Sequence, residues 1–182
     1  MISTDKAVNF SGDEFIQVGE MAKPFWERGR SANPPEFAIV VGGIASGKTT
    51  VRRQKFAEGY VHFDFGEIYR ALEKALGANH PRLADYASFA GNLILQESIP
   101  AKKNVVIEII GDKEELLAPL IGKMRETGYK VALHGIVADP AEAYQRHLKA
   151  MKEDPEYVSA HFTETATLSL LFHYLELKMP NV

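Results

Sequence analysis

Two kinds of hydrophobic pattern alternate along the chain. Short, nearly continuous apolar runs predict buried strands at 37–42, 60–64, 104–110 and 129–138. Between these runs, apolar residues recur at helical spacing and polar residues fill the opposite face. Because strands alternate with helices, the pattern predicts an α/β fold in three layers, with a mainly parallel sheet covered by helices on both faces. Four strands are few for this class, which leaves room for a fifth that the pattern does not reveal.

The helical pattern also predicts where each helix begins and ends. Helices are expected at 49–59, 66–76, 82–99, 112–128, 139–153 and 165–178, and glycine, asparagine and proline within 77–81 stop the second of them. Asp112 and Asp139 are in position to cap two of these helices, Pro140 suits the first turn, and Gly128 suits a helix end.

A further helix is expected near the N-terminus. Ser11 is a suitable N-cap, acidic residues follow it, and an apolar stripe includes Phe15, Val18, Ala22 and Phe25. Pro24 favours a bend in this helix, and the two prolines of the segment 31–36 end it. We expect residues 1–182 to form a single domain in which 1–35 are an N-terminal helical extension.

The first strand runs into a glycine-rich segment, "GGIASGKTT", which matches G-x-x-x-x-G-K-[ST] in full. Glycines let the backbone fold so that successive N–H groups point at phosphate oxygens, and the following helix adds its positive end. The lysine supplies a charge to the β- and γ-phosphates, and the threonine offers a hydroxyl to Mg²⁺. The sequence therefore predicts a nucleoside triphosphate site with ATP and Mg²⁺ as ligands. The residues expected to bind them are Gly42, Gly43, Ile44, Ala45, Ser46, Gly47, Lys48, Thr49 and Thr50.

Other classes of nucleotide-binding protein fit less well. A GTPase would carry an N/T-K-x-D segment, which is absent, and a motor or large ATPase would need more than 182 residues. A compact kinase is the remaining class. Such an enzyme needs a carboxylate to orient the acceptor hydroxyl, an acidic group near the metal, and cations around the transferred phosphoryl group.

Suitable carboxylates follow or lie within the predicted strands, where sites in open α/β sheets are found. Asp64 ends the second strand and Glu67 lies one turn further on, so either residue is a candidate base. Glu108 interrupts the apolar run "VVIEII", which favours a role near Mg²⁺ or substrate because an unpaired buried carboxylate is costly. The alternatives are an ion pair with a basic neighbour for Glu108 and a helix cap for Asp64. Spacing alone favours a solvated helix face for Arg146.

These motifs together resemble the zeta toxins, P-loop kinases that phosphorylate UDP-N-acetylglucosamine. "VNFSGDEF" (8–15) is similar to the family's opening segment, "AIVVGGIASGKTTVRRQKF" to its phosphate loop with the following arginine, and "NVVIEII" to its "NLVIEGT". The resemblance covers about residues 8–165. It implies that Glu108 lies near metal and substrate, that Arg146 contacts the nucleotide, and that an antitoxin is a partner.

The chain departs from the family at two places. Members of the family usually carry D-x-D-x-F-[RK] after the second strand, and the second Asp of this motif is the base. Here the segment is "DFGEIYR", which places Gly66 at the position of the second Asp. Asp64 or Glu67 then takes the role, or the acceptor differs, or transfer is weak. A second lid arginine is also absent, and His161 lies nearest to its place. The expectations therefore include a sugar-nucleotide kinase, a kinase for another small hydroxyl compound, and an ATP-binding regulatory module.

Composition adds limits on partners and location. The net charge of −3 gives no general attraction for nucleic acid. The absence of cysteine excludes disulfides and thiolate metal sites and is compatible with a reducing compartment. No run of 18 apolar residues and no signal-peptide pattern are present, so we expect a cytoplasmic protein without a membrane segment.

Overall fold

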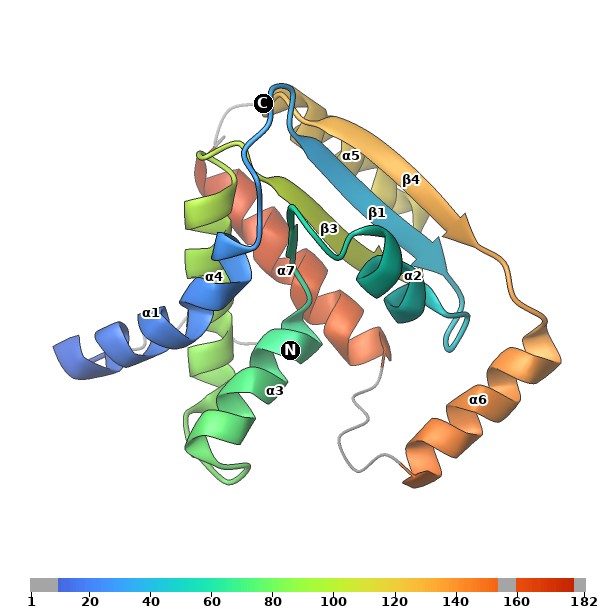
Figure 1. The fold of residues 1–182 in the computed structure, drawn as a ribbon, viewed down its shortest axis with the longest axis horizontal. Helices are drawn as coiled ribbons and strands as arrows, with labels where there is room; N and C mark the ends of the chain where they lie inside the picture. The colour runs from blue at the N-terminus through green and yellow to red at the C-terminus, as the bar shows by residue number, and fades with distance from the viewer. Residues whose placement is uncertain (1–9, 154–159, 179–182) are drawn as a thin grey trace.

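The computed structural model describes residues 10–153 and 160–178. Their sheet has four parallel strands in the order β2–β3–β1–β4. The strands are β1 (Glu36–Gly42), β2 (Tyr60–His62), β3 (Asn104–Ile109) and β4 (Lys130–Ile136). All four run in one direction, so their carboxyl ends meet at the same edge of the sheet (Figure 1). The predicted parallel sheet is confirmed, and the described residues add no fifth strand to it.

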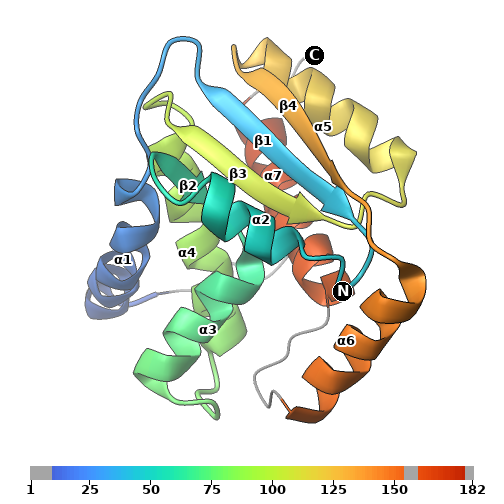
Figure 2. The same cartoon turned by 45° about the vertical axis from the view of Figure 1, so that its right-hand side comes forward.

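The helices lie on both faces of the sheet, so the predicted three layers are also confirmed. They are α1 (Gly12–Glu27), α2 (Lys48–Lys55), α3 (Phe65–Leu76), α4 (Leu83–Ser98), α5 (Glu114–Glu126), α6 (Pro140–Glu153) and α7 (Ala160–Lys178). Helix α2 covers one face, whereas α5 and α7 lie behind the sheet (Figure 2).

The two faces of the sheet are packed unequally. Alternate residues of a strand point to opposite faces, and on the helix-rich face Phe37 and Ile39 join a large core with α1, α4, α5 and α7. On the other face, Ala38 and Val40 pack in a small cluster around Phe56, which follows α2. Most of the apolar area that stabilises the fold is therefore buried on one side, and the short helix after the glycine-rich loop covers the other.

The structure corrects several of the predicted helix boundaries and confirms one predicted cap. Helix α2 ends at Lys55 rather than at 59, because Phe56 leaves the helical conformation and turns into the small cluster. Asp112 is not the cap of α5, which has Lys113 at its N-cap without a side-chain hydrogen bond. Asp139 does cap α6 as expected, since its Oδ1 accepts the backbone N–H groups of residues 141 and 142 at 2.9 and 3.0 Å. Helix α7 begins five residues earlier than predicted, at Ala160.

Helix α1 is confirmed with Ser11 as its N-cap, in a capping box with Glu14. Val18, Ala22 and Phe25 are buried, but Phe15, which the apolar stripe included, is 51% exposed. The Glu14 carboxylate also accepts hydrogen bonds from Arg82, at 2.6 Å, and from the Tyr86 hydroxyl. These contacts fix α1 on α4, and they explain why α1 lies against the body of the protein.

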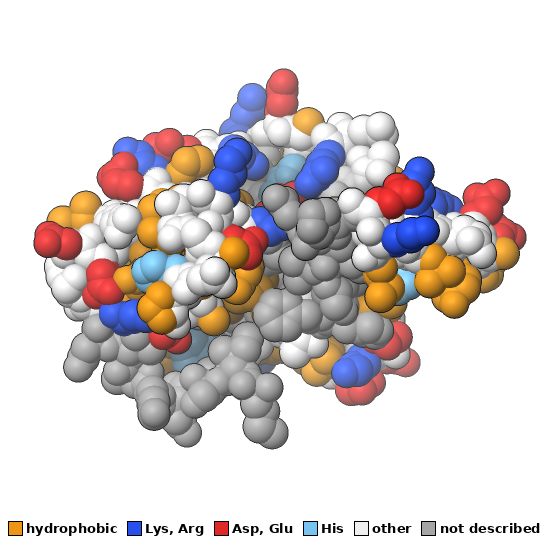
Figure 3. All heavy atoms as spheres, turned by 90° about the horizontal axis from the view of Figure 1, so that it is seen from below, with side chains coloured by type: hydrophobic (Ala, Val, Ile, Leu, Met, Phe, Trp, Pro, Cys, Tyr) orange, Lys and Arg blue, Asp and Glu red, His pale blue; other side chains and the backbone are white. Residues whose placement is uncertain are grey.

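Helix α6 projects from the sheet and, unlike the other helices, contains no buried residue. Tyr144, Leu148 and Met151 follow one another at helical spacing, and they are 59%, 42% and 60% exposed. Figure 3 shows hydrophobic side chains on this projecting arm, at the right of the view. No helix of the described residues is both long and apolar enough to cross a membrane.

Candidate functional site

The glycine-rich loop joins β1 to α2 at the carboxyl edge of the sheet. Gly47 adopts a left-handed conformation, with φ of 102°. At Gly42 an added Cβ would lie 2.7 Å from the carbonyl oxygen of Ile136. Glycine is therefore required at both ends of the loop, at one end by the backbone conformation and at the other by the close approach of β4.

Lys48 is the first residue of α2, and its side chain folds back over the loop. Its Nζ donates hydrogen bonds to the carbonyl oxygens of Gly42 and Gly43 at 2.7 and 2.8 Å, and only 8% of the residue is exposed. Burial lowers the pKa of Lys48, although the charges of Glu108 and Glu164 oppose the shift. Two carbonyl oxygens are weak partners for an ammonium group, so an anion at the loop would be a better one.

The loop also contains a buried polar atom without a partner. Ser46 is 8% exposed, and its Oγ forms no hydrogen bond within the described part of the chain. A buried hydroxyl without a partner costs free energy. Together with the left-handed Gly47 and the lysine, this hydroxyl fits a loop that holds a phosphate group.

A cavity of about 430 Å³ opens beside the loop. The loop and α2 contribute residues 45–50 to its lining, and Asp64, Glu108 and Arg146 lie on the other walls. The structure thus brings Lys48 and Thr49 together with two of the three predicted carboxylates. Glu67 lines a neighbouring cavity instead.

Arg52, on α2, holds the three predicted carboxylates together. Its Nε donates to Glu108, its two terminal nitrogens donate to Glu67 at 3.2 and 2.8 Å, and one of them reaches Asp64 at 3.4 Å. Its side chain is fully buried. Burial alone would lower the pKa of Arg52, but the hydrogen bond to Glu67 and the negative charges of all three carboxylates outweigh this effect and raise it. Sequence reasoning assigned no role to Arg52, although strand-end carboxylates that are buried require a cationic partner.

We expect the substitution Arg52→Met to destabilise the fold strongly. Removal of the buried cation leaves neighbouring carboxylates unpaired, which costs about 3–5 kcal/mol. Urea unfolding at neutral pH measures this loss. The matched control is Arg53→Met, because the Arg53 side chain is 61% exposed and its ion pair with Glu67 is worth less than about 1 kcal/mol.

The pH dependence of this loss has a definite sign. Pairing with Arg52 holds the pKa of Glu67 at about 2, below its ordinary 4.5, even though burial alone would raise it. The stabilisation from this pair is therefore complete above pH 4.5 and disappears as the pH falls toward 2. The difference between wild type and Arg52→Met should shrink over that interval, and a difference that grows with acidification would contradict the assigned pairing.

Asp64 differs from Glu67 in both position and acidity. Burial raises the pKa of Asp64, and Arg52 only partly offsets the rise. Its Oδ1 also accepts the N–H of Glu67 at 3.2 Å, so Asp64 caps α3 as well as lining the cavity beside the glycine-rich loop. The interpretation of Asp64 as a helix cap is confirmed, and its role as a base stays a prediction. A carboxylate with a raised pKa is a better proton acceptor than one that is held at about 2.

Thr49 and Glu108 form a pair that could hold a metal ion. The Thr49 hydroxyl donates its hydrogen to Glu108 at 2.9 Å, which leaves the oxygen lone pairs available as ligands. The described residues contain no cluster of three or more acidic or histidine side chains with metal-binding geometry. Mg²⁺ is commonly held by one or two protein groups plus substrate phosphates, so this oxygen pair fits it.

At Gly66 the structure has no room for a carboxylate. An added Cβ would lie 2.5 Å from Cγ2 of Thr163 on α7 and 3.1 Å from Oδ1 of Asp64. The glycine lets α3 and α7 approach closely. The side chain of Thr163 takes part of the space that an aspartate at position 66 would need, so Asp64 is the carboxylate of this segment that reaches the cavity beside the loop.

The substitution Gly66→Ala should lower stability by about 1 kcal/mol. Overpacking destabilises a fold by about 1–3 kcal/mol, and the higher helix propensity of alanine offsets part of this loss. Gly122→Ala is the control, because an added Cβ there meets nothing within 4 Å and should stabilise α5. Thermal unfolding should also show recovery in the double variant Gly66→Ala/Thr163→Ser, which removes the clashing methyl group. Equal stability of both alanine variants would refute the close packing.

Arg146 lies on α6 and lines the cavity beside the loop. Its side chain is 48% exposed and forms an ion pair with Glu142 at 3.6 Å, so it is also the solvated helix residue that spacing favoured. The side chain of His161, which lies nearest to the expected second arginine, is outside the described residues. Arg146 is thus a cation on the projecting arm that faces the loop cavity.

Beyond the loop, a second cavity of about 480 Å³ is mainly apolar. Gly43, Ile44 and Ser46 of the loop form one wall, and Ile136 and Tyr144 lie among the residues opposite. Ser46 lines both cavities, so the charged cavity and the apolar one adjoin each other at the loop.

Comparison with known proteins shows the family and the fold of this chain. The zeta toxin family model matches residues 26–172. Among solved structures, a chain from the PezAT chromosomal toxin–antitoxin system of Streptococcus pneumoniae is similar with a TM-score of 0.57 and 20% identity, over 80% of this chain. A chain from the Pnkp1/Rnl/Hen1 RNA repair complex is similar with a TM-score of 0.53 and 14% identity, over 81% of this chain.

The match is partial in length. The chain spans 65% of the first of these structures and 47% of the second. Comparison with curated proteins finds no match. At these identities the structural likeness shows the fold, and the family model, which matches most of the chain, shows the family. The chain therefore belongs to the zeta toxin family.

Proposed function

We propose that this protein is an ATP-dependent phosphotransferase that phosphorylates a hydroxyl group, with a sugar nucleotide such as UDP-N-acetylglucosamine as the acceptor. Family membership and the kinase-like fold support an ATP-using kinase. One observation carries the proposal further. Lys48, Asp64, Glu108 and Arg146 line one cavity at the carboxyl edge of the sheet.

Each of these residues has a chemical role in the proposal. ATP supplies the phosphoryl group. The loop amides and Lys48 bind its phosphates, and Lys48 and Arg146 offset the negative charge that develops during transfer. The apolar cavity beside Ile44 and Tyr144 suits the nucleoside half. Thr49 would hold Mg²⁺, and Glu108 orients Thr49 by accepting its hydroxyl hydrogen.

Asp64 is the proposed base. It lines the cavity with Lys48, and burial raises its pKa. It would accept the proton of the acceptor hydroxyl as the new oxygen–phosphorus bond forms and the bond between the γ-phosphorus and the bridging oxygen breaks, with ADP as the leaving group. Glu67 instead would act as a positioning residue that keeps Arg52 in place, since its carboxylate is bonded to two arginines.

The proposal is tested by ATP consumption in the presence of Mg²⁺, with and without UDP-N-acetylglucosamine. We expect this acceptor to stimulate ADP release and to appear as a phosphorylated product by mass spectrometry. Stimulation by another hydroxyl compound in a panel of nucleosides and sugars would instead identify a different acceptor. ATP binding without turnover on any acceptor would contradict the proposed phosphotransferase activity and favour an ATP-binding regulatory module. This module is the second candidate because Gly66 replaces the base expected in the family.

An antitoxin is a proposed partner, since one of the similar structures belongs to a toxin–antitoxin system. Co-expression with the product of an adjacent reading frame, followed by purification, would test this association. We expect a stable complex in which ATP binding is blocked, because a protein that covers the loop cavity would compete with the nucleotide.

A further inference from the structure

Helix α7 brings two polar side chains to the carboxyl ends of β2 and β3, and the proposed reaction gives them no role. They are Glu164 and Thr167, which lie about one turn apart, whereas most buried residues of α7 belong to the apolar core. Both line a small cavity of about 40 Å³, which Lys48, Asp64 and Glu108 also line. Helix α7 therefore lies next to the proposed transfer site.

Thr167 holds the beginning of α3. Its hydroxyl oxygen accepts the N–H of Phe65 at 3.1 Å, and only 2% of the residue is exposed. Phe65 is the first residue of α3 and directly follows Asp64, so this N–H is one of those that have no partner within the helix. The placement of the main chain beside Asp64 therefore depends on a buried contact with α7.

Glu164 holds the turn that follows β3. Its Oε1 accepts two consecutive N–H groups, from Ile110 at 2.9 Å and from Gly111 at 3.2 Å. Gly111 has a left-handed conformation, with φ of 73°, and an added Cβ there would overlap Cγ1 of Val41. Main-chain N–H groups that donate to a carboxylate form charge-assisted hydrogen bonds. Because this turn begins two residues after Glu108, Glu164 fixes the end of the strand that carries Glu108.

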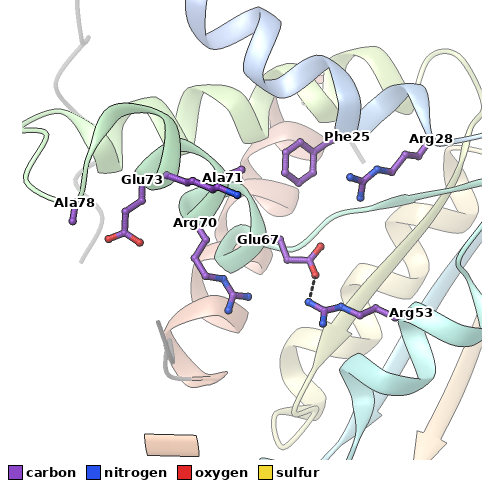
Figure 4. A pocket seen from close by; sticks show the side chains of 9 residues that line it. Phe25, Arg28, Arg53, Glu67, Arg70, Ala71, Glu73 and Ala78 are labelled. Atoms are coloured by element: carbon purple, nitrogen blue, oxygen red, sulfur yellow. Dashed lines mark hydrogen bonds and ion pairs between the residues drawn. The ribbon is translucent and has the colours of Figure 1, made fainter. Parts of the chain in front are cut away.

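The third carboxylate of the site is held by a different helix. Glu67 lines a separate cavity of about 820 Å³, shown in Figure 4, where Arg53 donates to it at 3.0 Å. Among the described residues, the Glu67 side chain bonds to Arg52 and Arg53 of α2 and to no residue of α7. Helix α7 thus contacts the segments of the two carboxylates that line the loop cavity, and α2 holds the third.

We propose that Thr167 and Glu164 are positioning residues, which hold Asp64 and Glu108 in the relative placement that phosphoryl transfer requires. Each acts on the main chain beside a carboxylate and does not touch the substrate. Such contacts matter because misplacement of a reacting group by about 1 Å can lower the rate roughly 100-fold. The inference rests on the proposed function for the roles of Asp64 and Glu108. It adds that both roles depend on a helix that is distant in sequence.

The substitution Thr167→Val tests the first contact, because valine keeps the shape of the side chain and removes the accepting oxygen. We expect kcat to fall at least tenfold, while the KM for ATP changes less than twofold because residues 42–50 are untouched. Thr167→Ser keeps the hydroxyl and should restore at least half of the wild-type kcat. Thr165→Val is the matched control, since Thr165 is exposed on the same helix and does not line the cavities that contain Lys48.

Two substitutions of Glu164 test the second contact. Glutamine keeps an oxygen that accepts N–H groups and removes the charge, whereas alanine removes both. We expect Glu164→Ala to lower kcat at least tenfold and Glu164→Gln to remain within threefold of wild type. An equal loss of kcat in both variants would contradict positioning, because it would assign the effect to the charge. This pair carries the test if Thr167→Val does not fold.

Amide hydrogen exchange, followed by NMR, examines the same contacts without turnover. Thr167→Val should accelerate exchange at Phe65 at least tenfold, and Glu164→Ala should do so at Ile110 and Gly111, with the amides of β1 unchanged. The proposal is overturned if Thr167→Val keeps the wild-type kcat, if Thr165→Val loses as much, or if exchange at these amides does not change. A wild-type protein without turnover on any acceptor would contradict the phosphotransferase, and the exchange comparison would still decide whether α7 holds these two segments.

Discussion

Lys48→Ala should abolish phosphoryl transfer and weaken ATP binding. Lys48 provides an ammonium group at the loop, where it is bonded to the carbonyl oxygens of Gly42 and Gly43. Its loss removes charge stabilisation from the transferred group, for which removal of comparable groups in other enzymes costs roughly 10³-fold or more in rate. We expect kcat/KM to fall by at least that factor in the ATP-consumption assay, with a rise in the dissociation constant for ATP.

Lys55→Ala is the matched control for this substitution. Lys55 is the last residue of the same helix and is exposed, so its removal deletes an equal charge without reaching the loop cavity. Near-normal turnover in Lys48→Ala would contradict the proposed role of the loop. The fold of Lys48→Ala should survive, because the substitution removes a buried charge rather than creating one.

Asp64→Asn should lower kcat by about 10²–10⁴-fold, the usual range for loss of a general base. Asparagine keeps the size and the hydrogen-bonding oxygen that caps α3, so the loss reports on proton transfer rather than on folding. The wild-type kcat should fall with acidification at a pH above the ordinary aspartate pKa of 3.8, because the pKa of Asp64 is raised. This acidic limb should be absent from the residual activity of Asp64→Asn.

Glu67→Gln is the comparison that identifies the base. The Glu67 carboxylate is directed to two arginines and does not line the loop cavity, so we expect less than a tenfold fall in kcat. The pKa of about 2 makes it the weaker proton acceptor of the pair. A larger loss in Glu67→Gln than in Asp64→Asn, with both variants folded, would transfer the role of base to Glu67.

The fold was predictable where the hydrophobic pattern was simple. The apolar runs located all four strands, and Ser11 and Asp139 located two helix starts, because a cap is a local interaction between neighbours in sequence. The end of α2 was not predictable, since Phe56 leaves the helix to fill a cluster with residues of β1 and β3. Long-range packing of this kind overrides a local helical pattern.

The candidate site was predictable in its residue types but not in its pairings. The glycine-rich motif located the loop, and charge within an apolar strand identified Glu108. That Asp64, Glu67 and Glu108 share Arg52 depends on the order of strands β2, β3 and β1 beneath α2. The roles proposed for Asp64 and Glu67 rest on which of them lines the loop cavity, and a one-dimensional pattern does not contain that information.

Isothermal calorimetry of the intact protein with ATP and Mg²⁺ tests the phosphate loop most directly. We expect saturable binding at a single site, at least tenfold weaker in Lys48→Ala and unchanged in Lys55→Ala. The absence of detectable binding for both ATP and GTP in the presence of Mg²⁺ would contradict the assignment of a nucleotide site to residues 42–50.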